Sequence, residues 1–251
     1  KYNIKLTINN ENIGVIKSFE KSIEMCDGGY IALADQDDIW YENKIEVLLN
    51  EINGFSLVYT DADIIDENGK DTQKKFSQIN KLTGLDSSNC DFFYFNMFNS
   101  IILGCTMLFK SELKPFILPV YIDRDNHDKF ISLIASQLNG IKFVNRNLFQ
   151  YRIHENNLSF KSKRKTTRQK IFERNSIPIL DSGYINYTNE ILKLFGSDQI
   201  KWTEDLSRNV IFTQTYNMKN RILFYLKYNK YMFSRNGLYN RVKNTLRFLI
   251  K

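Results

Sequence analysis

The feature that most constrains the fold is a short apolar run that stops abruptly at a cluster of carboxylates. Residues 30–34 (YIALA) have the pattern of a strand buried on both faces, as in parallel sheets, and the acidic segment 35–38 (DQDD) follows at once. Helical apolar spacing at about 41–52 and a strand-like run at 56–60 come next. This order predicts an α/β sheet with right-handed crossovers, in which ligands bind beyond the carboxyl ends of the strands.

Further elements follow from the spacing of apolar residues. The second strand is predicted to end at Asp61 and Asp63, before a turn at 66–69. Gly104 interrupts another strand-like run, which indicates a bulge or the close approach of a ligand. The remaining predicted elements are a helix at 12–26, a loop plus a helix within 64–98, a strand at 101–109, a helix at 126–139 and a short strand at 141–144.

Charge divides the chain near residue 160. Residues 1–160 carry 16 basic and 22 acidic side chains, whereas residues 161–251 carry 19 basic and 6 acidic ones. We therefore expect a core at 1–160 and a basic, aromatic-rich, helical tail at 161–251. The tail fits the surface of an anionic bilayer, although its helices can equally pack on the core. Binding of single-stranded nucleic acid is a less favoured alternative.

Composition excludes several classes of protein. The three cysteines form no CxxC pair, which argues against a secreted disulfide scaffold and against a structural zinc site. Only two histidines are present, so a metal centre built from histidines alone is excluded. No apolar run reaches the roughly 18 residues of a membrane span, and no signal peptide is visible at the start. We expect a cytoplasmic protein, with the tail placing it on the inner face of the membrane.

Three carboxylates within four residues repel one another unless a cation is present. Asp35, Asp37 and Asp38 offer the hard oxygen ligands that Mg²⁺ or Mn²⁺ prefers. Such an ion usually leaves coordination positions for substrate phosphates, which points to a diphosphate substrate. The alternative is that these residues merely cap the helix that follows.

The segment 28–46 (GGYIALADQDDIWYENKIE) closely resembles the metal-binding segment of family 2 glycosyltransferases with the GT-A fold, particularly rhamnosyltransferase-like bacterial members. The resemblance covers about residues 10–160. It continues at 12–15 (NIGV), 59–69 (YTDADIIDENG), 104–109 (GCTMLF), 127–128 (HD) and 151–157 (YRIHENN). It implies a mixed sheet flanked by helices, followed here by the helical basic region.

The resemblance also implies transfer of a sugar, with inversion, from a nucleotide-diphosphate donor to an acceptor hydroxyl. The acceptor would be a glycan or a lipid-linked glycan of a bacterial cell-surface polysaccharide. Asp128 would be the general base, kept ionised by its helix N-terminus. The metal ligands would be Asp35 and Asp37; the donor-binding residues Asp35, Asp38, Trp40, Arg152 and His154; and the acceptor-binding residues Gly104, Cys105, Thr106 and His127.

Each of these roles has a plainer structural alternative. Asp128 can be a helix cap, His154 an ordinary loop histidine, Trp40 a packing residue and Gly104 a sheet bulge. Asp61 and Asp63 can line the same cleft, but are better explained as the end of a strand.

One part of the family pattern is missing. Family members begin with a strand, a helix and a second strand that hold the nucleotide base, and nothing before Asn10 supplies them. We therefore expect the chain to be a fragment of a longer enzyme or a truncated, inactive relative.

Overall fold

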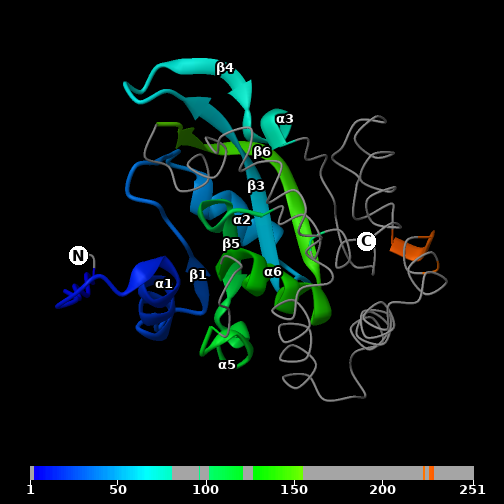
Figure 1. Ribbon diagram of the computed structural model, residues 1–251. Coiled ribbons are helices and arrows are strands. Elements are labelled where there is room, and N and C mark those ends of the chain that lie inside the picture. Colours follow the sequence, from blue (N-terminus) through cyan, green and yellow to red (C-terminus); the bar gives the residue numbers. More distant parts are fainter. Residues whose placement is uncertain are drawn as a thin grey trace.

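The computed structural model describes residues 3–80, 96, 102–120, 127–154, 223 and 226–228. These residues build a six-stranded mixed sheet with helices packed against it (Figure 1). The strands follow the order β1-β5-β3-β6-β2, and β4 pairs with β3 off this path. The strands are β1 (Tyr30–Ala32), β2 (Ile39–Trp40), β3 (Leu57–Ile65), β4 (Asp71–Lys75), β5 (Met107–Lys110) and β6 (Ile141–Arg152).

The parallel pair of β3 and β6 forms the centre of the sheet, and every other pairing is antiparallel among the described strands. Because β5 is antiparallel to both β1 and β3, these two strands run in the same direction. Their carboxyl ends therefore lie on the same side of the sheet. The segment that follows β1 is acidic, so the sheet presents carboxylates at that side.

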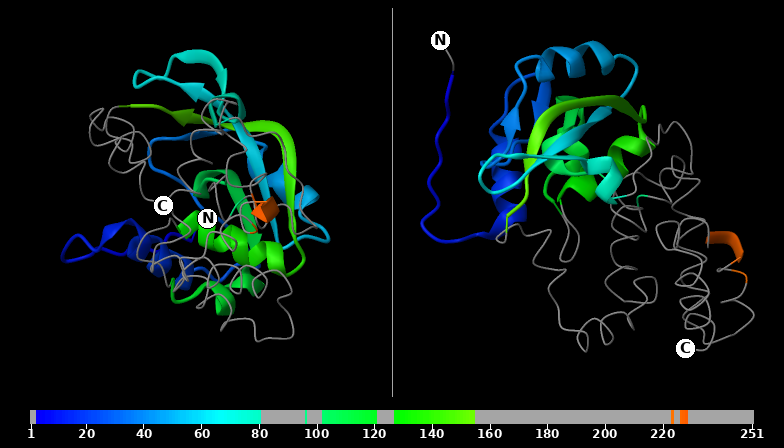
Figure 2. Two further views of the ribbon diagram at one scale, coloured as in Figure 1. Left: turned by 45° about the vertical axis from the view of Figure 1, so that its right-hand side comes forward. Right: turned by 90° about the horizontal axis from the view of Figure 1, so that it is seen from above.

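Helices cover both faces of the sheet. Figure 2 shows α2 and α6 on opposite faces. On the α2 face, Leu48 and Ile52 pack against Val58, Leu108 and Val144 as one buried cluster. The helices are α1 (Gly14–Glu24), α2 (Lys44–Glu51), α3 (Phe76–Asn80), α5 (Lys114–Ile117) and α6 (His127–Gln137), with 3₁₀ turns η1 (Gly104–Thr106) and η2 (Ser111–Leu113).

The predicted α/β class, a mixed sheet flanked by helices, is confirmed for the described residues. The helices predicted at 12–26, 41–52 and 126–139 are present with shorter ends. In α2 and α6, apolar residues three and four apart pack against the sheet, which is the pattern that predicted them. In α1 only Ile23 is buried, and Phe19 stacks on His127.

The first strand differs from its prediction. It was expected to be buried on both faces, yet Tyr30 is 46% exposed. The reason is that β1 lies at one end of the strand order and pairs with β5 alone among the described strands. Only Ile31 of its three residues is buried.

The second strand also differs, because β3 continues to Ile65 and contains Asp61 and Asp63. Asp61 tolerates burial because it accepts hydrogen bonds from the backbone N–H and hydroxyl of Ser77 at the start of α3, at 2.9 and 2.5 Å. Asp63 accepts one from the Tyr41 hydroxyl at 2.8 Å. The expectation that these two residues end the strand is wrong.

Three further strands depart from the sequence pattern. The region predicted as a loop contains β4, which forms a hairpin with β3 around the predicted turn at 66–69. The strand predicted at 101–109 begins only at Met107, after the η1 turn. The strand predicted at 141–144 continues to Arg152.

The predicted boundary near residue 160 and the helical tail lie outside the described residues, apart from 223 and 226–228. Within the described part of the chain, no helix combines the length and apolarity needed to cross a bilayer.

A groove of about 640 Å³ lies between the segment before α1 and the end of that helix. Lys21 donates to the Asn9 side chain across it at 2.9 Å. Ile4, Leu6 and Ile8 on the same segment are exposed. None of the groove's lining residues belongs to the acidic segment 35–38.

Candidate active site

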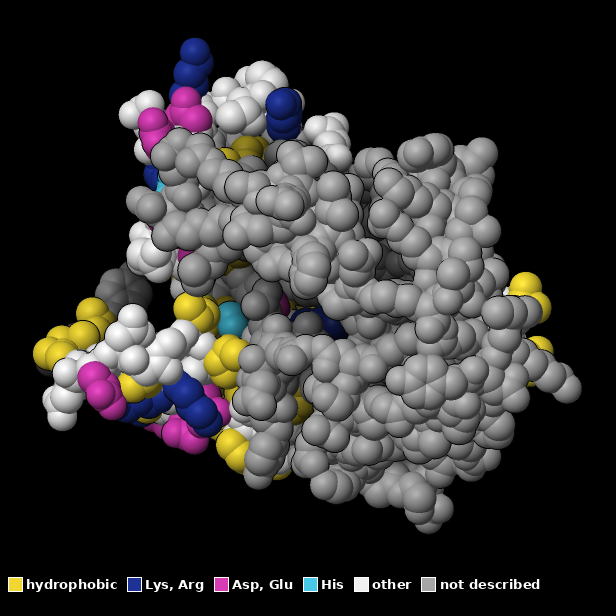
Figure 3. Space-filling model, viewed as in Figure 1, with side chains coloured by type: hydrophobic (Ala, Val, Ile, Leu, Met, Phe, Trp, Pro, Cys, Tyr) yellow, Lys and Arg dark blue, Asp and Glu magenta, His cyan; other side chains and the backbone are white. Residues whose placement is uncertain are grey.

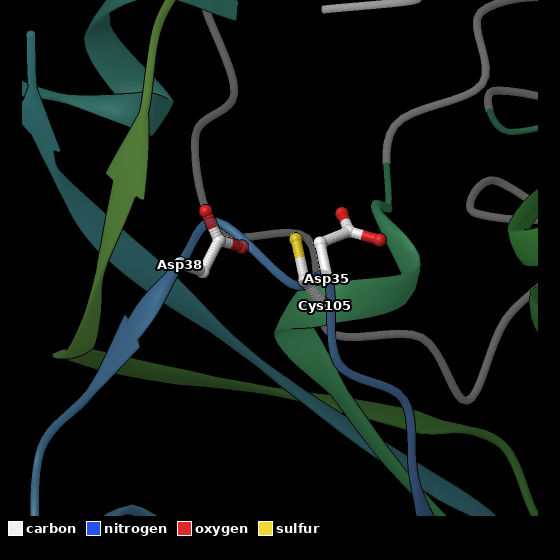
Figure 4. A group of neighbouring side chains, drawn as sticks. All are labelled: Asp35, Asp38 and Cys105. Carbon is white, nitrogen blue, oxygen red and sulfur yellow. The ribbon is translucent and has the colours of Figure 1, made fainter. Parts of the chain in front are cut away.

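The acidic loop, residues 35–38, connects β1 to β2 and meets the η1 turn. One carboxylate oxygen each of Asp35 and Asp38 and the Cys105 Sγ all lie within 4.8 Å of one another. Figure 4 shows the thiol between the two carboxylates, which reach it from the loop while Cys105 comes from η1. The structure thus brings two residues of the acidic loop together with one residue predicted on the acceptor side.

Burial acts on the carboxylates of this cluster more strongly than the positive charges around them. Burial raises the pKa of Asp38 to about 6. The pKa of Asp35 is also raised, mainly by burial and to a smaller extent by the negative charge of Asp37. Asp38 Oδ1 accepts the Arg152 backbone N–H at 3.1 Å, while its buried Oδ2 has no nitrogen or oxygen partner among the described residues. An orphaned carboxylate oxygen beside a second carboxylate is a place where a divalent cation fits.

Asp37 points to a different partner. Its Oδ2 lies 2.7 Å from His154 Nε2, just after β6. The backbone carbonyl of Asp37 also accepts the Arg152 Nε–H at 2.9 Å. The motif at 151–157, which closes the predicted core, is therefore joined to the acidic loop through Arg152 and His154.

Arg152 is committed to backbone groups as well as to the loop. One guanidinium nitrogen donates to the carbonyls of Asp66 and Glu67 in the β3–β4 turn, at 3.3 and 3.2 Å. These contacts hold the acidic loop against the turn. The predicted grip on a diphosphate stays a prediction.

Asp128 lies near the start of α6, behind η1. Its Oδ2 accepts the Gly104 backbone N–H at 3.3 Å, and its Oδ1 accepts the Lys129 N–H at 2.7 Å. Burial nevertheless raises the pKa of Asp128 to about 6. The expected effect of the helix N-terminus is present in the bond to Lys129, but burial outweighs it. The carboxyl group still ionises below neutral pH.

His127 is buried beside Gly104. Its ring stacks on Phe19 of α1 with centroids 3.9 Å apart, and neither ring nitrogen has a hydrogen-bond partner within the described part of the chain. Burial lowers the pKa of His127 to about 4, so the imidazole is neutral at pH 7. A Cβ on Gly104 would lie 3.0 Å from His127 Nε2. The close approach predicted for this glycine is thus to a histidine side chain.

The two other predicted residues pack into the structure. The Thr106 hydroxyl donates to the Leu103 carbonyl at 2.7 Å within the η1 turn. Trp40 packs against the buried cluster that includes Cys105 and Phe149. The Trp40 contact agrees with the plainer alternative of a packing residue.

On the face seen in Figure 3, a histidine side chain is visible in a hollow with acidic and basic side chains beside it.

Lys44, the first residue of α2, was not predicted as a site residue. Its side chain is completely buried, and its Nζ donates to the Cys105 carbonyl at 2.8 Å. Burial lowers the pKa of Lys44 to about 8, while the charges of Asp38 and Asp35 act in the opposite direction. The only signal in the sequence was a basic residue six positions after the last aspartate of the loop.

One family model matches the part of the chain that contains the acidic loop. Residues 1–111 match the family model described as glycosyl transferase family 2. The matched segment contains the acidic loop, Lys44 and η1. The resemblance to family 2 glycosyltransferases predicted from the sequence is confirmed over these residues.

Curated relatives agree with this family. The chain is 25% identical over 172 residues to the Escherichia coli UDP-Glc:alpha-D-GlcNAc-diphosphoundecaprenol beta-1,3-glucosyltransferase WfgD, covering 66% of this chain and 62% of that protein. It is 31% identical over 158 residues to the Shigella flexneri dTDP-rhamnosyl transferase RfbG, covering 58% of this chain and 52% of that protein. The chain thus spans less than two thirds of the length of either relative.

Among solved structures, the chain is similar to the crystal structure of S. aureus TarS 1-349 in complex with UDP-GlcNAc. The TM-score is 0.41 and the sequence identity is 13%, over 92% of this chain and 68% of that one.

Proposed function

We propose that this chain transfers a sugar from a nucleotide-diphosphate donor to an acceptor hydroxyl, with inversion, in the synthesis of a bacterial cell-surface polysaccharide. The observation that carries the proposal is the position of η1. Cys105 contacts the carboxylates of the acidic loop, while the preceding residue, Gly104, donates to Asp128. A candidate metal site and a candidate base therefore lie on two sides of one short turn.

A divalent ion, Mg²⁺ or Mn²⁺, fits the acidic loop. Asp35 and Asp37 are the predicted ligands. Asp35 lies in one cluster with the carboxylate of Asp38, which offers a further oxygen, whereas Asp37 faces His154. When bound, such an ion neutralises the charge of a departing nucleoside diphosphate. The pairing of Asp37 with His154 keeps this carboxylate turned toward the end of β6.

Asp128 is proposed as the base that accepts the proton of the acceptor hydroxyl. A single displacement needs one carboxylate near the attacking oxygen, and this carboxylate must be ionised at the working pH. With a pKa of about 6, Asp128 is mostly ionised at pH 7, yet it is more basic than an exposed aspartate. The neutral His127 beside it offers hydrogen bonds to acceptor hydroxyls from a ring whose nitrogens have no partner.

The names of the relatives support the choice of substrates. WfgD is named for UDP-Glc and for a diphosphoundecaprenol-linked acceptor, and RfbG for a dTDP-rhamnosyl donor. We accordingly propose a nucleotide-diphosphate sugar as donor and a glycan or lipid-linked glycan as acceptor.

The basic tail at 161–251, beyond the proposed core at 1–160, is proposed to bring the enzyme to the anionic inner face of the membrane. Sedimentation with phosphatidylglycerol vesicles tests this proposal: binding at low salt that is lost at high salt supports it. An absence of vesicle binding at low salt, or a preference for oligonucleotides, would overturn it.

The catalytic proposal is tested with UDP-glucose and dTDP-rhamnose, by measuring release of the nucleoside diphosphate from the full chain with and without MnCl₂. Release is expected only with metal and is lost in Asp37→Ala. Asp71→Ala, an exposed aspartate in β4, is the matched control. Absence of both donor binding and release in the wild type would support the alternative of an inactive relative.

A further inference from the structure

The buried ammonium of Lys44 lies beside the η1 turn and has no part in the roles assigned above. It belongs to the first turn of α2, and the side chain is 0% exposed. Burying a charged amine is costly unless hydrogen bonds or opposite charges compensate for the loss of water. Its contacts therefore indicate why it is kept at this position.

Three contacts surround the Lys44 Nζ. It donates to the Cys105 carbonyl at 2.8 Å and lies 3.8 Å from the centroid of the Trp40 ring and 4.2 Å from that of Phe149. The aromatic faces attract the cation without neutralising it. In the described part of the chain no carboxylate forms an ion pair with it.

These contacts join three parts of the site. Trp40 follows the acidic loop directly, Cys105 is the η1 residue whose thiol lies between Asp35 and Asp38, and Lys44 starts the helix that supports both. One ammonium group thus fixes the η1 turn against the loop and adds a positive charge behind its carboxylates.

We propose that Lys44 is a positioning residue that holds η1 against the acidic loop and whose charge weakens the loop's affinity for a bare divalent cation. This inference rests on the proposed function of the acidic loop. A fixed positive charge near the ion repels it, so the loop alone holds the ion weakly. The phosphate oxygens of a donor then supply the missing negative charge. The ion and the donor are therefore expected to bind together.

The test is the affinity for MnCl₂ alone, measured at pH 7 by electron paramagnetic resonance on the full chain without donor. Lys44→Met removes the charge but keeps a long unbranched side chain. It is expected to tighten Mn²⁺ binding by about tenfold, because the charge of Lys44 acts on Asp38 and Asp35, and at an effective dielectric of about 20 a unit charge within about 10 Å of a divalent ion is worth at least this much. Lys44→Arg keeps the charge and is expected to leave the affinity within about threefold.

A second variant and a matched control complete the experiment. Lys44→Gln keeps a donor for the Cys105 carbonyl and is also expected to tighten Mn²⁺ binding, which provides the test if Lys44→Met does not fold. Lys142→Met makes the same change at a lysine paired with Glu51, and no change in Mn²⁺ affinity is expected. Circular dichroism verifies that each variant is folded.

The outcomes separate the two proposals. Folded charge-removing variants that bind Mn²⁺ no more tightly than the wild type would overturn the role of Lys44, while Mn²⁺ binding by the wild type would still support the metal site. A wild type that binds no Mn²⁺ with or without UDP would overturn the metal site itself, and with it the inference about Lys44.

Discussion

The carboxylate of Asp37 lies 2.7 Å from Nε2 of His154, across 117 positions of sequence. This contact joins the loop after β1 to His154, which lies two residues beyond the end of β6. The strands of the sheet bring the two segments together. The acidic loop and the motif at 151–157, which are far apart in the sequence, thereby form one site.

Because Asp37 and His154 form a pair, their substitutions should not be additive. We expect Asp37→Asn and His154→Gln each to weaken Mn²⁺-dependent binding of a nucleotide-diphosphate sugar by about tenfold, and the double variant to be little worse than either single one. Calorimetric titration of the four proteins measures this coupling. Fully additive losses would mean that the two side chains act separately.

Asp128→Asn should reduce sugar transfer by about 10²- to 10⁴-fold, because the amide cannot accept a proton. Donor binding should remain near the wild-type level, because Asp128 contacts Gly104 and Lys129 and not the acidic loop. Initial rates and donor titrations on the same preparations measure both quantities. Equal loss of transfer and donor binding would contradict a role as the base.

The pH dependence of metal binding follows from Asp38. Its pKa of about 6 lies above the usual value of 3.8, which means that the folded protein favours the protonated carboxyl group. Without metal, the contribution of Asp38 to stability is therefore fully present below about pH 3.8 and is lost as pH rises through about 6. A bound cation has the opposite preference, because it needs the ionised form. We expect MnCl₂ to raise Tm at pH 7.5 and to have little effect at pH 5.

Comparing Tm with and without metal at each pH removes the contributions of groups away from the ion. The Asp38→Asn variant is the control for this experiment and should lose most of the metal-induced increase in Tm at pH 7.5. An increase in Tm that is the same at both pH values would exclude Asp38 as a ligand.

Gly104→Ala should destabilise the protein by about 1–3 kcal/mol, because the added Cβ would lie 3.0 Å from His127 Nε2. Combining it with His127→Ala should recover part of this loss, since the smaller side chain makes room. Urea unfolding measures both effects. Gly29→Ala, where an added Cβ meets no atom within 4 Å, is the matched control and should be nearly neutral.

Asp61→Ala should lower the free energy of unfolding by about 1–3 kcal/mol, because it leaves the Ser77 N–H and hydroxyl without their acceptor. The exposed Asp71 again serves as the control position, and chemical unfolding of both variants gives the difference. If the two substitutions cost the same, the buried bonds between β3 and α3 add no stability.

The sequence was sufficient to place the acidic loop, because an apolar run that stops at carboxylates marks the end of a strand. It was insufficient for Lys44, whose contact with the Cys105 carbonyl spans 61 positions and depends on how α2 packs. Nor could the polar residues of β4 predict a strand, since they pair only because the turn at Asp66 returns the chain to β3.

Burial changed two expectations about charge. A helix N-terminus predicts a readily ionised Asp128, but its enclosure behind η1 raises the pKa instead. The same strand that was expected to end at Asp61 continues, because α3 supplies donors to the buried carboxylate. Neither effect is visible without the tertiary packing.

The most direct test of the metal-dependent transferase is donor binding by the wild-type chain and by Asp37→Ala, titrated with UDP-glucose and dTDP-rhamnose in the presence and absence of MnCl₂. We predict saturable binding of at least one donor that requires the metal and disappears in the variant. Donor binding of equal strength without metal, or retained by the variant, would contradict the assignment of the acidic loop as the metal site.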